Sequence, residues 1–82
     1  MSKWAEIYYI PNAKNGKVAF NVNSSEGSVG TYTCSKDKDE ISMIKGLIIE
    51  EISHRGITLD NTEVENFLNN KTNEIKRPSH KN

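Results

Sequence analysis

Apolar and polar residues alternate along the first part of the chain with the period of two that is typical of β-strands. The alternation is clearest over residues 17–23. Residues 5–10 and 29–34 are rich in β-branched and aromatic side chains, and turn-forming residues separate the three segments. The pattern predicts a three-stranded antiparallel meander with one buried face, which would carry Val18, Phe20 and Val22.

The period then changes to that of an amphipathic helix. Asp37 and Glu40 stand in capping-box positions, and Gly56 follows the periodic segment where a glycine commonly ends a helix. His54 and Arg55 complement the negative end of this helix. The apolar residues that recur at helical spacing are Ile41, Ile44, Leu47, Ile48 and Ile52.

A shorter second helix is predicted after residues 57–59, which are either a fourth edge strand or a connector. Thr62 and Glu65 form its capping box. Its apolar stripe consists of Val64, Phe67 and Leu68. The expected fold class is therefore α+β, in the order β-β-β-α-(β)-α, with both helices on one face of the sheet.

The chain is short enough to form only one domain, which we place at residues 1–70, followed by a flexible basic tail over 71–82. Hydrophobic residues make up 34% of the 82 residues, so the core is expected to be thin. A thin core leaves room for a protein partner or a homodimer to contribute to stability.

No apolar run approaches the roughly 20 residues that span a bilayer, and the N-terminal residues lack the apolar segment of a signal peptide. We therefore expect a cytoplasmic protein without a membrane partner. The single cysteine, Cys34, has no partner for an internal disulfide and is expected to be a small core or edge residue.

Catalytic and metal-binding constellations are missing from the sequence. With only His54, His80 and Cys34, the chain has no zinc-type spacing, and His54 is expected to be a helix-end residue. Glu50 and Glu51 point about 100° apart on a helix and do not form a shared site. We expect no catalytic residue, no cofactor and no metal, and thus no enzyme, although an oligomer could still build a pocket between its subunits.

The charge distribution is uneven although the net charge is zero: +2 over residues 1–38, −5 over 39–65 and +3 over 66–82. The acidic segment is that of the helices. The leading hypothesis is a non-catalytic protein-binding module whose acidic helical face docks on a basic protein, for example one that handles nucleic acid. The residues of that face are Glu50, Glu51, Asp60, Glu63 and Glu65.

The alternative is a small nucleic-acid-binding regulator that uses the wet face of the sheet. This face would carry Trp4, Tyr8, Lys17 and Asn21, and the basic tail would add Lys71, Lys76, Arg77 and Lys81. The opposite phase of the first strand, in which Trp4 and Tyr8 cover the core, stays open at this point.

Lysine, asparagine and isoleucine, which have AT-rich codons, are used heavily. This usage suggests a gene from a low-GC bacterium or its phage. Together with the small size, it favours a phage- or mobile-element-type inhibitor or modulator of a host protein.

Overall fold

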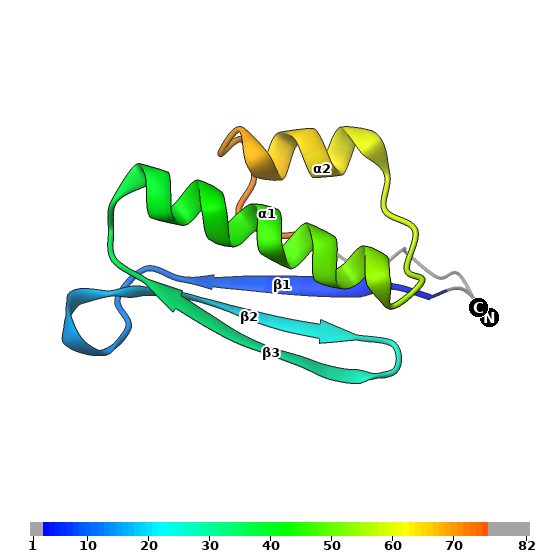
Figure 1. Cartoon of the computed structure of the whole chain (residues 1–82), viewed down its shortest axis with the longest axis horizontal. Helices are drawn as coiled ribbons and strands as arrows, with labels where there is room; N and C mark the ends of the chain where they lie inside the picture. The colour runs from blue at the N-terminus through cyan, green and yellow to red at the C-terminus, as the bar shows by residue number, and fades with distance from the viewer. Residues whose placement is uncertain (1–2, 76–82) are drawn as a thin grey trace.

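The computed structural model describes residues 3–75 and contains a three-stranded antiparallel sheet covered on one face by two helices (Figure 1). The strands are β1 (Ala5–Ile10), β2 (Val18–Ser24) and β3 (Gly27–Cys34), in the spatial order β1-β2-β3. The helices are α1 (Lys38–His54) and α2 (Asn61–Leu68), and a short 3-10 helix, η1 (Lys14–Gly16), lies between β1 and β2. The predicted α+β order is confirmed. Residues 57–59 are a connector between the helices and not a strand.

The alternation of side chains across the sheet places one set under the helices and the other on the opposite face. Val18, Phe20 and Val22 are buried, as predicted. Ile7 pairs with Val22 and is also buried, whereas its neighbour Tyr8 is exposed on the other face. Strand β1 therefore has the phase in which Tyr8 points away from the core.

Helix α1 begins and ends at the residues that the sequence indicated. The Asp37 side chain accepts a hydrogen bond from the backbone N–H of Glu40 at 3.2 Å. At the other end, Gly56 has φ of +76°. The N–H groups of Gly56 and Ile57 donate to the carbonyls of Ser53 and Ile52 at 3.0 and 3.3 Å, which is a Schellman motif.

Helix α2 begins earlier than the predicted capping box of Thr62 and Glu65. Asp60 is the N-cap, and its side chain accepts from the backbone N–H of Thr62 at 2.7 Å. Aspartate is a strong N-cap residue, which explains the shift. The buried residue of α2 is Phe67, whose ring meets Phe20 edge to face with centroids 6.0 Å apart.

A lysine, and not an aliphatic residue, occupies the centre of the buried face of α1. Lys45 is 1% exposed and its ammonium donates to the carbonyl oxygen of Phe67 at 2.7 Å and to Oδ1 of Asn70. It also reaches Oδ1 of Asn73 at 3.5 Å and lies 4.7 Å from the centre of the Phe67 ring. One ammonium thus holds the C-terminal end of α2 and the loop that follows it against α1.

Asn70 makes this arrangement compatible with the end of α2. It has φ of +63°, a conformation that asparagine tolerates better than most residues. Its N–H donates to the carbonyl of Phe67 and that of Lys71 donates to the carbonyl of Asn66, so α2 also ends in a Schellman motif. The chain then turns back toward the sheet.

Residues 71–75, which the sequence assigned to a flexible tail, return to β1. Ile75 is 1% exposed in the core, and its carbonyl accepts from the N–H of Ile7 at 3.2 Å. Figure 1 shows this segment passing from the end of α2 down to the side of β1. The segment is held by the burial of Ile75, by this backbone hydrogen bond and by the contact between Lys45 and Asn73. The remainder of the predicted tail, residues 76–82, lies outside the described residues.

We predict that Lys45→Met lowers the free energy of unfolding by about 1–3 kcal/mol, because the oxygens that accept from the ammonium lose their donor. Urea denaturation would measure this change. Hydrogen exchange should become faster at the amide of Ile7, whose acceptor is in the segment that Lys45 holds. Lys14→Met, at an exposed position, is the matched control. Unchanged stability and unchanged protection of Ile7 in Lys45→Met would contradict the prediction.

Candidate protein-binding surface

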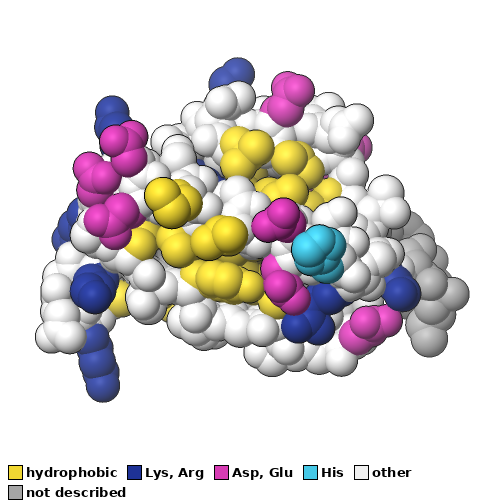
Figure 2. Space-filling model, in the orientation of Figure 1, with side chains coloured by type: hydrophobic (Ala, Val, Ile, Leu, Met, Phe, Trp, Pro, Cys, Tyr) yellow, Lys and Arg dark blue, Asp and Glu magenta, His cyan; other side chains and the backbone are white. Residues whose placement is uncertain are grey.

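The helical layer carries large apolar side chains that the core does not take up. Met43 is 66% exposed, Leu47 is 47% exposed and Leu68 is 38% exposed. The first two lie four residues apart on α1 and are therefore neighbours on the helix surface. Figure 2 shows hydrophobic side chains gathered over α1 and α2 on one face of the molecule. We call Met43, Leu47 and Leu68 the helical patch.

Leu47 recurs at helical spacing with the isoleucines of α1, yet it is exposed. The buried residues of α1 are Lys45, Ile48 and Ile52. Lys45 occupies the buried stripe of α1 between Ile41 and Ile48. Leu47 therefore lies beside this stripe and not in it. The position of Lys45 is compatible with the buried stripe, because it stands three residues before Ile48 and seven before Ile52. Because lysine is charged, the sequence pattern did not indicate that this residue is buried.

Three of the five predicted acidic residues lie next to the helical patch along their own helices. Glu50 and Glu51 follow Leu47 by three and four residues, and Glu65 precedes Leu68 by three. Glu51 also forms an ion pair with Arg55, with 3.2 Å between Oε2 and Nε. Figure 2 shows acidic side chains around the margin of the hydrophobic area and not in one block.

The other two predicted acids have a different setting. Asp60 caps α2, so its carboxylate is engaged with the helix backbone. Both Asp60 and Glu63 line a cavity of about 270 Å³, together with Lys3, Trp4, Ala5, Thr58 and Leu59. The structure therefore does not bring the five acids together as one face.

The predicted residues of the sheet face are also only partly brought together. Tyr8 and Asn21 are cross-strand partners on the face opposite the helices, and the Asn21 amide donates to Oγ1 of Thr31 at 3.3 Å. Lys17 is exposed just before β2. Trp4 precedes β1 and lines the cavity beside α2, about 13 Å along the chain from Tyr8. Tyr8 and Asn21 thus lie side by side on the uncovered sheet face, whereas Trp4 lines the cavity beside α2.

Within residues 3–75, no three His, Cys, Asp or Glu side chains are placed to hold a metal ion. His54 is exposed in the last turn of α1. Cys34 is buried, which confirms its assignment as a core residue, and burial is the main reason why its thiol pKa is raised.

Comparison with protein-family models, with curated proteins and with solved structures finds no match to this chain. In the part of the chain that the structure describes, no helix has the length and apolar character needed to cross a bilayer.

We predict that Cys34 makes the stability of the protein depend on alkaline pH. In the unfolded chain the thiol has a pKa near its ordinary value of 9.0, and in the folded protein this pKa is raised. The stability gained by burying the neutral thiol is therefore complete below 9.0 and is lost as the pH rises above it. The difference in unfolding free energy between the wild type and Cys34→Ala should shrink over this range in urea denaturation. A difference that stays constant would contradict the prediction.

Proposed function

We propose that this chain is a non-catalytic protein-binding module, and that its helical layer docks on a basic surface of a partner protein. The observation that carries the proposal is the helical patch of Met43, Leu47 and Leu68 with the carboxylates beside it. An apolar centre with a polar rim is the usual composition of a protein interface.

The apolar residues supply a reason for association. Their side chains remain 38–66% exposed although the chain has few hydrophobic residues for its core. Burial in an interface removes this apolar surface from water, and long unbranched Met side chains adapt well to a partner. Exposed apolar side chains gathered on one face of a small domain are typical of an interaction site.

The charges supply a reason for the choice of partner. Seven carboxylates lie between residues 39 and 65, and two basic residues accompany them. One of the two, Lys45, is buried, and the other, Arg55, is paired with Glu51. With Lys45 buried, the exposed or half-buried side chains between residues 39 and 65 include one basic group against seven carboxylates. Complementary charge would favour a basic partner, such as a protein that handles nucleic acid, and would speed the encounter.

The role most consistent with these features is that of a cytoplasmic inhibitor or modulator of a host protein, as phages and mobile elements encode. The small size of the chain and its use of residues with AT-rich codons support this assignment. An acidic surface that competes for a basic site needs no catalytic group of its own.

Nucleic-acid binding through the sheet face is the second candidate. Tyr8 is 46% exposed on the uncovered face beside Asn21, where an aromatic ring can stack on an unpaired base. Glu6 points to the same face and opposes a phosphate backbone, so the protein-binding role is favoured.

We predict that the double variant Met43→Asp/Leu47→Asp loses its partner. The full-length protein would be used as bait in a lysate of a low-GC bacterium, and captured proteins would be quantified by mass spectrometry. The wild type should retain a basic protein in stoichiometric amount, and the variant should retain about tenfold less or none, because interface centres carry most of the binding energy. Thr31→Asp, on the sheet face, is the matched control and should retain the partner. Equal losses in both variants, or capture of no stoichiometric partner, would count against the helical layer.

The nucleic-acid alternative makes a separate prediction. If it holds, Tyr8→Ala weakens the binding of a single-stranded oligonucleotide at low salt, and Leu47→Asp does not. Fluorescence anisotropy over a salt series would measure both variants, because binding to phosphates weakens steeply as salt rises. No binding by the wild type at low salt would eliminate this alternative.

A further inference from the structure

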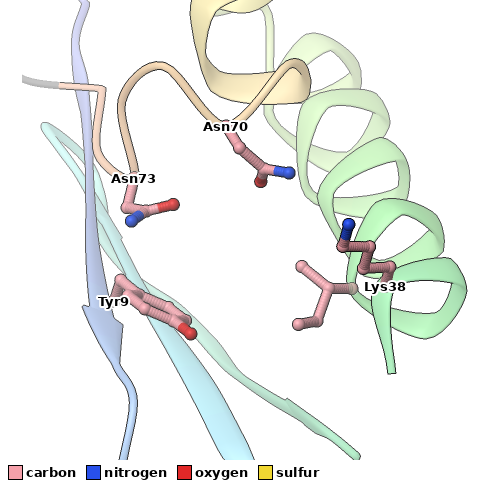
Figure 3. A pocket seen from close by; sticks show the side chains of 5 residues that line it. Tyr9, Lys38, Asn70 and Asn73 are labelled. Atoms are coloured by element: carbon pink, nitrogen blue, oxygen red, sulfur yellow. The ribbon is translucent and has the colours of Figure 1, made fainter. Parts of the chain in front are cut away.

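A polar cavity lies between the sheet, the first turn of α1 and the loop after α2. Its volume is about 250 Å³, and Figure 3 shows the five residues that line it: Tyr9, Lys38, Ile41, Asn70 and Asn73. Segments far apart in the sequence form this site. Lys38 and Asn70 point toward one another across the space, and Tyr9 lies on the sheet side (Figure 3).

Lys45 determines which atoms the asparagines can offer. Its ammonium has only donors, so the oxygens Oδ1 of Asn70 and Asn73 are the atoms turned toward it. The NH₂ group of each amide is then left as a donor for other partners. Lys38 can only donate, and the Tyr9 hydroxyl can donate. The polar side chains that line the cavity thus have donors to offer.

The charged side chain that lines the cavity is positive, which suits the same kind of ligand as the donors do. Its lining includes no carboxylate. Lys38 supplies a positive charge in the first turn of α1, where the helix dipole is also positive. Lys45, whose partners Phe67, Asn70 and Asn73 accept through neutral oxygens, adds a second positive charge behind the asparagines. The nearby carboxylates of Asp37 and Glu40 accept backbone hydrogen bonds at the start of α1 and do not line the cavity.

We propose that this cavity binds an oxyanion, the phosphate or carboxylate group of a small molecule. Lys38 pairs with the charge, and the amide groups of Asn70 and Asn73 and the Tyr9 hydroxyl donate hydrogen bonds to the oxygens. Charge-assisted hydrogen bonds of this type are the strong ones in anion recognition. The site is separate from the helical patch and does not depend on the proposed protein-binding function.

The test is a titration of the full-length ¹⁵N-labelled protein, followed by NMR, with inorganic phosphate and separately with acetate at constant ionic strength. We expect saturable shifts of the side-chain amide signals of Asn70 and Asn73 with at least one of the two anions. Lys38→Met should weaken binding about tenfold, the effect of one lost charge-assisted hydrogen bond. Lys14→Met removes the same charge at an exposed position outside the cavity and should leave binding unchanged.

Asn73→Asp provides a second, sharper variant. The new carboxylate can still accept from Lys45, which favours retention of the fold, but its charge repels an anion and binding should be abolished. A response to phosphate alone or to acetate alone supports the proposal and identifies the chemical class of ligand. Shifts that do not saturate with either anion would overturn it, as would equal weakening by Lys38→Met and Lys14→Met. Lys38 is exposed, so its variant keeps the test valid even if Asn73→Asp does not fold.

Discussion

The buried ammonium of Lys45 is the interaction on which the arrangement of the helical layer depends. It joins three segments, because it projects from α1, donates to the Phe67 carbonyl at the end of α2 and donates to Asn70 and Asn73 in the following loop. A buried charge is costly unless hydrogen bonds replace its hydration. Three oxygens and an aromatic ring do so here, and burial lowers the lysine pKa. The same hydrogen bonds direct the chain back to β1, where Ile75 enters the core.

This lysine also shapes both surfaces for which we propose a role. Because it occupies the buried stripe of α1, Leu47 and Met43 are turned outward. Its positive charge is also buried and is not exposed on the acidic surface of the helices. At the same time it turns the oxygens of Asn70 and Asn73 toward itself and leaves their NH₂ groups as donors for the polar cavity. One residue with a structural task thereby sets the chemistry of two separate surfaces.

The candidate surfaces were only partly predictable. Alternation indicated Asn21 on the uncovered face of the sheet but left the phase of the first strand open, and the register of β1 on β2 places Tyr8 beside Asn21. The acidic residues were predicted as a group from their closeness in sequence, yet Asp60 caps a helix and lines a cavity with Glu63, whereas Glu50, Glu51 and Glu65 lie beside the helical patch. Closeness along a chain does not determine which face of a helix a residue occupies, and the relative rotation of α1 and α2 depends on contacts that a linear pattern does not contain.

The sequence by itself determined the elements and their order. The periods of two and 3.6, the turn residues, the cap at Asp37 and the glycine at position 56 are local signals, and short-range sterics and hydrogen bonds are sufficient to interpret them. The tertiary structure alone decided that Lys45 is inside, that Leu47 is outside and that residues 71–75 join the domain. Each of these outcomes depends on whether partners distant in sequence offset the free-energy cost of desolvating a polar group. The partners of Lys45 lie 22 or more residues away from it, and the N–H of Ile7 in the sheet donates to the carbonyl of Ile75. Only the assembled fold brings these groups together.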